Sequence, residues 1–217
     1  MKNDITLEER QHHLRINKPS PWVARFAPIA QENTPVLDIA AGGGRHSQVF
    51  LNQGHPVTAI DKNTTALSDL PHQENLKIVE FDMETGNSMF AQGSPLFGQT
   101  FGVIVVVNYI FRPLFPDLMD VLAPGGLFLY ETFALGNEAY ARPRNPDHLL
   151  KSGELLELTS GQMQIVAYEH GIVENGDIPG VKQRLCAVKD MNLSKREDNE
   201  PPTHVIENKG LTPSNTI

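Results

Sequence analysis

Short apolar runs alternate with stretches of helical spacing between residues 35 and 133. Apolar positions at i, i+3, i+4 and i+7 predict helices over residues 43–53 and 113–122. The apolar runs between them have the length and β-branched content of buried strands, and they predict strands over 35–40, 56–61, 76–82, 101–108 and 127–133. Strands that alternate with helices along a chain form a parallel sheet with helices on both faces.

Both ends of this region depart from the alternation. The pair Ser20-Pro21 predicts a helix start, because serine accepts a free backbone N–H and proline has no N–H to leave unpaired. After a helix near 153–160, two more strands are expected over 163–173 and 181–189. The linker over 174–180 is too short for a crossover helix, so these strands should pair as an antiparallel hairpin. The expected fold class is α/β, a Rossmann-like doubly wound sheet of five parallel strands plus a C-terminal antiparallel hairpin.

The chain divides into three parts by composition. Residues 1–19 are a polar N-terminal segment, residues 20–190 form the expected domain, and residues 191–217 are a polar tail that should be disordered because it has little apolar surface to bury. We find no internal repeat. The N-terminus has no apolar signal core, and no apolar run is long enough to cross a membrane. These features predict a cytoplasmic protein with no membrane partner.

Composition narrows the classes of partner. The 217 residues contain a single cysteine, so an internal disulfide is excluded. A formal net charge of -8 argues against nucleic acid as a partner, because phosphate backbones bind basic surfaces. The expected partner is a small-molecule substrate, and the expected oligomeric state is a monomer or a weak homodimer.

The main candidate ligand-binding residues lie where the first predicted strand ends. Residues 36–47 read VLDIAAGGGRHS, a strand that enters a glycine turn and a helix. Ligands of open parallel sheets bind beyond the carboxyl ends of the strands. A dinucleotide fingerprint G-x-G-x-x-G is incomplete here, because Ser47 stands where the third glycine belongs. Asp38 suits a cationic ammonium group, and Asp61, at the end of the second strand, can accept the ribose hydroxyls of NAD or of any adenosine.

Five segments in this order resemble the class I S-adenosylmethionine (SAM) methyltransferases. They are VLDIAAGGGR, Asp61 after VTAI, FDME at 81–84, VIVVVN ending at Asn108, and LAPGGLFLYETF at 122–133. The resemblance implies the seven-stranded fold of that family, SAM as cofactor and S-adenosylhomocysteine (SAH) as product. Ala40 departs from the pattern, since many members carry glycine there. The segments NYIFRPL at 108–114 and ETFALGNE at 131–138 resemble, more narrowly, a small bacterial group of uncharacterised and tellurite-resistance-type methyltransferases.

The resemblance and the strand ends together assign the cofactor site. The glycines would line the methionine part of SAM, Asp38 would organise its ammonium group, Asp61 would accept the ribose hydroxyls, and Asp82 with Met83 would meet the adenine. Each acid has an alternative role as a turn or helix-start residue. The full expected cofactor set is Asp38, Ala40, Gly42, Gly44, Asp61, Lys62, Asp82, Met83 and Asn108.

The expected substrate site is formed by Tyr109, Arg112 and the long connection over residues 134–150. Long connections without regular structure are often binding loops, and the alternative is a surface loop without a ligand. The arginines favour an anionic acceptor, because guanidinium pairs with carboxylate or phosphate. The expected substrate-binding set is Tyr109, Arg112, Tyr140, Arg142 and Arg144.

No catalytic residue can be assigned from the sequence. Glu131, Tyr109 and His148 are candidate general bases, and none has a spacing that decides the matter. Arg45 is a candidate for the SAM carboxylate, and His46 reads as a packed helix residue. No H-x-x-x-H or C-x-x-C motif is present, so no metal is expected.

The leading interpretation is therefore a SAM-dependent methyltransferase acting on a small acceptor, with an anionic one favoured. An RNA or protein methyltransferase is one alternative, although Asn108-Tyr109-Ile110-Phe111 lacks the prolines of the D/N-P-P-Y/F segment of amino-methylating enzymes. A non-catalytic SAM-binding protein is the second, and an NAD-dependent oxidoreductase is the third.

Overall fold

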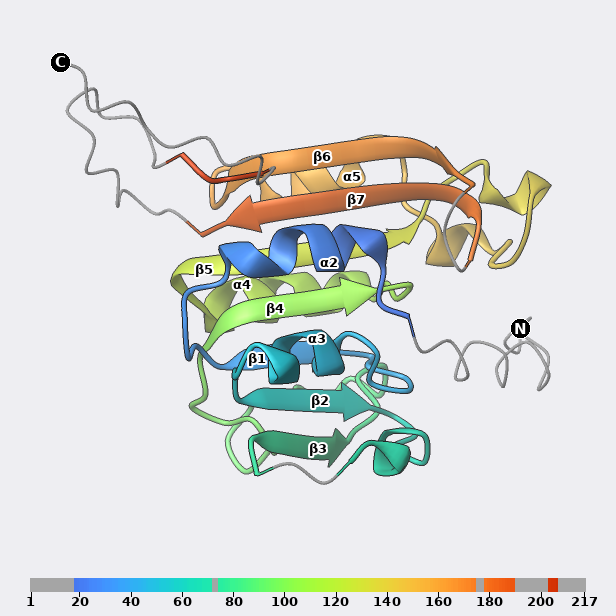
Figure 1. Cartoon of the computed structure of the whole chain (residues 1–217). Coiled ribbons are helices and arrows are strands. Elements are labelled where there is room, and N and C mark those ends of the chain that lie inside the picture. The colour runs from blue at the N-terminus through green and yellow to red at the C-terminus, as the bar shows by residue number, and fades with distance from the viewer. Residues whose placement is uncertain (1–17, 72–73, 175–177, 190–202, 207–217) are drawn as a thin grey trace, which may run out of the picture.

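The computed structural model describes residues 18–71, 74–174, 178–189 and 203–206. These residues form a seven-stranded sheet in the order β3-β2-β1-β4-β5-β7-β6 (Figure 1). The strands are β1 (Val36–Ile39), β2 (Val57–Asp61), β3 (Leu76–Glu80), β4 (Phe101–Val107), β5 (Leu122–Phe133), β6 (Gln164–Val173) and β7 (Gly180–Val188).

The first five strands are parallel to one another, and β7 pairs antiparallel with both β5 and β6. The expected sheet and its terminal hairpin are therefore confirmed. Because β7 runs opposite to β5, its first residues lie at the same edge as the carboxyl ends of the parallel strands. This edge, which we call the carboxyl edge, gathers the ends of β1, β2, β3, β4 and β5 and the start of β7.

Helices cover both faces of the sheet. The α-helices are α2 (Pro21–Phe26), α3 (Ser47–Asn52), α4 (Phe115–Val121) and α5 (Glu154–Thr159). Short 3-10 helices span η1 (Ala27–Ile29), η2 (Leu67–Asp69), η3 (Arg112–Leu114), η4 (Asn137–Ala139) and η5 (Pro146–His148). Helices α2 and α3 pack on one face with the cluster around Trp22, Phe50 and Leu129, whereas α4 and α5 pack on the other with the cluster around Phe115, Phe128 and Leu155.

Two local predictions need adjustment. The helix predicted over 43–53 begins only at Ser47, because Gly42 and Gly44 have positive φ angles, which a helix does not allow. The turn predicted over residues 123–126 lies within β5, where Phe101 pairs with Leu122 but Val103 pairs with Leu127. The four residues between Leu122 and Leu127 are thus accommodated as a bulge rather than as a separate turn.

The start of α2 follows the prediction closely. The Ser20 hydroxyl accepts a hydrogen bond from the Trp22 backbone N–H at 3.1 Å, and Pro21 occupies the first helical position. This cap fixes the chain where it enters the carboxyl edge. Most of the N-terminal segment and of the polar tail lies outside the described residues, so the disorder expected for the tail is untested. Within the described part, no helix is long and apolar enough to cross a membrane.

Candidate functional site

The glycine turn after β1 has a backbone that approaches its neighbours closely. Ala40, Gly42 and Gly44 all have left-handed φ angles, of 53°, 58° and 76°. Glycine adopts such angles without strain, whereas alanine at this position costs roughly 1–2 kcal/mol. A Cβ atom on Gly44 would also lie 2.4 Å from Cδ1 of Leu70. The turn is therefore shaped by backbone conformation, and the N–H groups of Ala41 and Gly44 are engaged by the carbonyls of Ile60 and Ala41.

Asp61 connects this turn to the end of β2. Its Oδ2 accepts a hydrogen bond from the Gly42 N–H at 2.9 Å, and its Oδ1 accepts one from the Asn63 N–H at 3.0 Å. A carboxylate offers about four acceptor positions, so each oxygen of Asp61 keeps one for a ligand. The structure thus brings the glycine turn and the predicted ribose acceptor into direct contact.

Asp38 has a different environment from the one its predicted role implies. Its side chain is 1% exposed, and its Oδ2 accepts a hydrogen bond from the Ser47 hydroxyl at 2.6 Å. Burial raises the pKa of this carboxyl to about 7, against the opposing effect of the Ser47 hydrogen bonds. The contact made by Asp38 is the helix-start bond given above as the alternative. Its action on an ammonium group remains a prediction, and it would have to pass through an intervening group.

The residues expected at the adenine lie at the end of β3. Asp82 is exposed, and its Oδ1 accepts a hydrogen bond from the Glu84 N–H at 3.0 Å, which makes it a turn acid. Met83 is 7% exposed and packs into the core on the α4 side. Its side chain is therefore structural, and only its backbone is a candidate for the adenine. Lys62 is exposed beside Asp61.

Tyr109 lies near the acids at the ends of β2 and β3, and its predicted role in substrate binding remains a prediction. Burial raises the pKa of its hydroxyl well above the ordinary value, and Glu84, Asp82 and Asp61 reinforce this effect electrostatically. The hydroxyl oxygen is buried, and no contact among the described residues has full hydrogen-bond geometry, although Glu84 lies close enough to raise the pKa through a hydrogen bond. Tyr109 therefore remains a neutral phenol near the ends of β2 and β3, and its high pKa argues against a role as general base.

Arg112 joins three parts of the chain, and its predicted contact with substrate remains a prediction. Its Nε and Nη2 donate to the two carboxylate oxygens of Glu154, the latter at 3.0 Å. Its Nη1 donates to the Asp147 carbonyl at 2.7 Å and its Nη2 to the Leu149 carbonyl at 2.8 Å. The guanidinium thus joins η3, η5 and the start of α5, and these contacts leave it little capacity for a ligand.

Arg112→Ala is expected to lower the free energy of unfolding by about 1–3 kcal/mol, because Glu154 and two carbonyls lose a charged donor. Denaturant unfolding monitored by circular dichroism would measure this effect. Glu154→Gln serves as the matched variant, since it weakens the same pair from the other side while it preserves the side-chain shape. Wild-type stability in Arg112→Ala would contradict this structural role and favour the predicted contact with substrate.

The connection over residues 134–150 is anchored at its base and open at its tip. Asn137 is fully buried, and its Oδ1 accepts from the Val181 N–H at 3.1 Å while its Nδ2 donates to the Pro143 carbonyl at 3.1 Å. Tyr140 and Arg144 are exposed, and Arg142 is half-buried. The loop therefore has a fixed base, whereas the substrate-binding roles of these side chains remain predictions.

A buried charged network occupies the other half of the carboxyl edge, and the sequence did not indicate it. The Lys182 Nζ donates to Oε1 of Glu131 at 2.7 Å and to Oδ1 of Asn108 at 3.1 Å. Lys182 and Glu131 are 4% and 2% exposed. Arg184 adds a second cation, with its Nε 3.3 Å from Oε2 of Glu131. Two ion pairs to Glu131 thus tie the end of β5 to β7, and the hydrogen bond from Lys182 to Asn108 adds the end of β4.

The network continues to the residues that begin α2 and α3. The Ser20 hydroxyl donates to Oε2 of Glu131, and the Ser20 N–H donates to Nε2 of His46 at 3.2 Å. Burial, Arg45 and Lys182 hold the pKa of His46 well below its usual range, so the ring is neutral and free to accept this bond. His46 is 4% exposed, which agrees with its expected role as a packed residue.

The candidate bases gain no support from this geometry. Burial alone would raise the pKa of Glu131, but Lys182 and Arg184 outweigh burial and hold the pKa below its ordinary value. Both of its oxygens already have partners, so it is a poor proton acceptor. His148 is exposed at the end of η5. No cluster of His, Cys, Asp and Glu suited to a metal occurs among the described residues.

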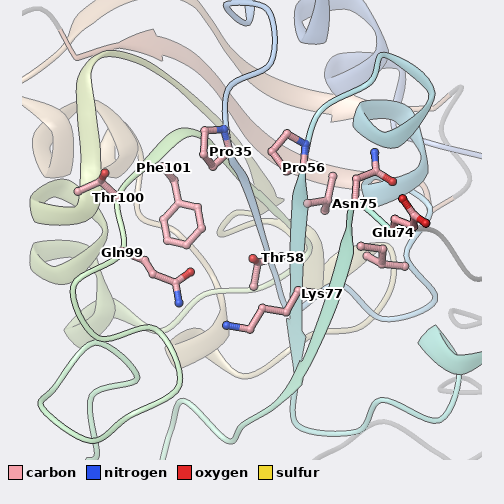
Figure 2. Close-up of a pocket in the computed structure, with 11 residues that line it drawn as sticks. Pro35, Pro56, Thr58, Glu74, Asn75, Lys77, Gln99, Thr100 and Phe101 are labelled. Atoms are coloured by element: carbon pink, nitrogen blue, oxygen red, sulfur yellow. The ribbon is translucent and has the colours of Figure 1, made fainter.

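A cavity of about 400 Å³ lies at the opposite edge of the sheet, between the amino ends of β1, β2, β3 and β4 (Figure 2). Thr58, Lys77 and Gln99 are among its polar lining residues. The Lys77 Nζ and the Gln99 Nε2 both donate to the Pro95 carbonyl, at 3.4 and 3.2 Å. These donors support the loop over residues 81–100, so the cavity does not compete with the carboxyl edge as the functional site.

No family model and no curated protein matches the sequence. Solved structures match its fold. TehB from Haemophilus influenzae has a TM-score of 0.59 at 20% identity over 77% of this chain, which spans only 61% of the TehB chain. The glycopeptide N-methyltransferase MtfA complexed with SAM has a TM-score of 0.53 at 20% identity, covering 80% of this chain and 96% of its own.

A SAM-dependent methyltransferase from Methanosarcina mazei has a TM-score of 0.56 at 17% identity, covering 76% of this chain and 96% of its own. At these identities the matches establish the fold. This chain has the class I methyltransferase fold, as its sequence motifs indicated.

Proposed function

We propose that this protein is a SAM-dependent methyltransferase that acts on a small molecule. The observation that carries the proposal is the hydrogen bond between the Gly42 N–H and Asp61 Oδ2. It unites the two motifs that a SAM site requires, a glycine turn after β1 and an acid at the end of β2, on a fold whose solved neighbours include SAM-bound methyltransferases.

The residues present fit the cofactor. Asp61 has an acceptor position left on each oxygen, which suits the two ribose hydroxyls. The left-handed backbone at Ala40, Gly42 and Gly44 keeps side chains away from the place where the methionine part would lie. Tyr109 adds a buried hydroxyl beside the acids on the adenosine side.

Bound SAM would supply a sulfonium-activated methyl group, so the protein must mainly bind and orient the acceptor. Glu131, Lys182 and Asn108 form a rigid wall at the ends of β4 and β5. The neutral Tyr109 and the ion-paired Glu131 supply no strong base. Such a site suits an acceptor that is already deprotonated when it binds, as carboxylates and phosphates are.

Asp61→Ala is expected to weaken SAH binding by about 1–3 kcal/mol, or roughly 5- to 150-fold in Kd, because the ribose hydroxyls lose their acceptor. Calorimetric titration of SAM and SAH, with NAD as a control ligand, would test both the proposed function and this residue. Thr64→Ala is the matched control, since its hydroxyl donates to Glu80 close to the same strand end. Equal affinities of wild type and Asp61→Ala for SAH would mean that the adenosine does not bind at Asp61. Binding of NAD alone would favour an oxidoreductase.

A further inference from the structure

The amide of Asn108 has a fixed orientation at the carboxyl edge. An ammonium group only donates hydrogen bonds, so the Lys182 Nζ must face the amide oxygen of Asn108, as its 3.1 Å contact with Oδ1 shows. The Nδ2 group therefore points the other way. It makes no hydrogen bond within residues 18–71, 74–174, 178–189 and 203–206, and Asn108 is only half-buried.

Lys182 is held in place from several sides. Its Nζ is 2.7 Å from Oε1 of Glu131 and 4.9 Å from the centre of the Phe133 ring. Glu131 is itself fixed by Ser20 and Arg184. Because each member is anchored by a neighbour, the orientation of the Asn108 amide is built into the fold before any ligand binds.

The charge near Asn108 favours an anion. Lys182 and Arg184 both pair with the buried carboxylate of Glu131, and the other partner of Arg184, Glu169, is half-exposed, so two cations share one buried carboxylate. This local excess of positive charge contrasts with the net charge of -8 of the whole chain. An ammonium or a primary amine would meet a donor N–H and an unfavourable potential there, whereas an anionic oxygen would meet a matched donor.

We propose that Asn108, oriented by Lys182, selects a methyl acceptor that presents an anionic oxygen, such as a carboxylate. This inference rests on the proposed function and deepens it. Asn108 would contact the acceptor through Nδ2, and Lys182 would act as a positioning residue through Asn108. Asn108 could accept a hydrogen bond from an amino group of the methyl acceptor only through its Oδ1. That oxygen already accepts a hydrogen bond from Lys182, so we do not expect Asn108 to bind an amino group.

The test uses the full chain saturated with SAH, with acetate as the carboxylate probe and methylammonium as the amine probe. The side-chain amide signals of Asn108, observed by ¹⁵N NMR and assigned with Asn108→Asp, report binding. Saturable shifts with acetate, and a response to methylammonium at least ten-fold weaker, are expected. Because SAH fills the subsite of the cofactor carboxylate, acetate that binds only without SAH identifies that subsite instead and overturns the proposal.

Two variants separate orientation from folding. Asn108→Asp replaces the donor with a carboxylate and tolerates the left-handed φ of 57°, so acetate affinity should fall at least ten-fold while the fold persists. The double variant Lys182→Met with Glu131→Gln removes the ion pair without leaving a lone buried charge, and the preference for acetate over methylammonium should disappear. Lys77→Met, at the opposite edge, should change neither probe.

The outcomes distinguish failure of the proposed function from failure of the proposed role of Asn108. Failure of the wild type to bind SAH overturns the proposed function and this inference with it. Normal SAH binding combined with an absent acetate response, or with an unchanged preference in the double variant, overturns the inference alone.

Discussion

Replacing Glu131 by alanine is expected to lower the free energy of unfolding by about 3–5 kcal/mol at pH 7. The carboxylate is 2% exposed and lies 2.7 Å from Lys182 Nζ. Its removal leaves the Lys182 ammonium buried with Asn108 as its remaining hydrogen-bond partner among the described residues, and it takes the partner of the Ser20 hydroxyl as well. Urea unfolding followed by circular dichroism would measure the loss.

The double variant Glu131→Gln with Lys182→Met is the control for this prediction. It removes both charges while it keeps the side-chain volumes, and replacement of a buried ion pair as a unit is often close to neutral. Arg184 retains Glu169 at 3.2 Å in that variant. If the free energy of unfolding of Glu131→Ala lies within about 1 kcal/mol of the wild-type value, the prediction is wrong. Water would then reach the Lys182 ammonium and replace its lost hydrogen bond.

Glu131 also predicts a dependence on pH. Its folded pKa lies below the ordinary value, so the native state binds fewer protons than the unfolded state in the acid range. The stabilisation by Glu131 is therefore present above the unfolded pKa and is lost as the pH falls through the folded pKa. The difference in stability between wild type and Glu131→Ala should accordingly shrink on acidification.

Asp38→Asn is expected to stabilise the protein by as much as about 4 kcal/mol at pH 8, the largest gain we predict. Burial raises the pKa of Asp38 from 3.8 to about 7, so the charged form is strongly disfavoured in the native state. Asparagine has the same shape, carries no charge, and can still accept the hydrogen bond of the Ser47 hydroxyl. Thermal or urea unfolding at several pH values would measure the difference.

The sign of the pH effect follows from the raised pKa. Between the unfolded value of 3.8 and the folded value of about 7, the native state binds more protons, so wild-type stability falls as the pH rises. Asp38→Asn has no carboxyl group at this position, so its stability lacks this dependence on pH. Its advantage over the wild type should therefore grow by about 2–3 kcal/mol between pH 5 and pH 8 and level off above the folded pKa. A constant difference across this range would contradict the buried, protonated carboxyl.

The same variant separates the two roles of Asp38. If the carboxylate organises the ammonium group of SAM, Asp38→Asn should bind SAM more weakly, and wild-type affinity should rise with pH as Asp38 loses its proton. If Asp38 serves only the start of α3, the variant should bind SAM as the wild type does. Ser47→Ala is the control, because it removes the hydroxyl partner and leaves the carboxyl group in place.

The course of the chain was largely predictable from local patterns. Continuous β-branched runs such as the one in β4 occur where a strand is buried on both faces, and β4 is central in the sheet. The short linker after β6 required an antiparallel return. The Ser20 cap was also predictable, because capping depends on residues within one turn. Strand ends then placed Asp38, Asp61, Asp82 and Asn108 at one edge without any knowledge of tertiary contacts.

The partners of the charged side chains could not be predicted from local sequence patterns. Arg112 reads as a substrate contact in the sequence, yet Glu154, which lies 42 residues further along, claims its guanidinium. Asp38 reads as a ligand group, yet the start of α3 buries it against Ser47. In both cases a charged side chain pairs with the nearest complementary group in space, and that group is fixed by how helices dock on the sheet.

Lys182 shows most clearly the difference between what the sequence predicts and what the tertiary structure decides. In the sequence it is one polar position of an alternating strand, and such positions usually face water. The antiparallel register of β5 and β7 sets Glu131 opposite Arg184 and Phe133 opposite Lys182, and this places the lysine beside a glutamate 51 residues away. The sequence by itself determined the strands, the turn and the edge at which the candidate site residues gather, because these follow from local periodicity. Only the tertiary structure decided which charges are buried and which way Asn108 faces, because both depend on strand register and on the packing of α2 across the sheet.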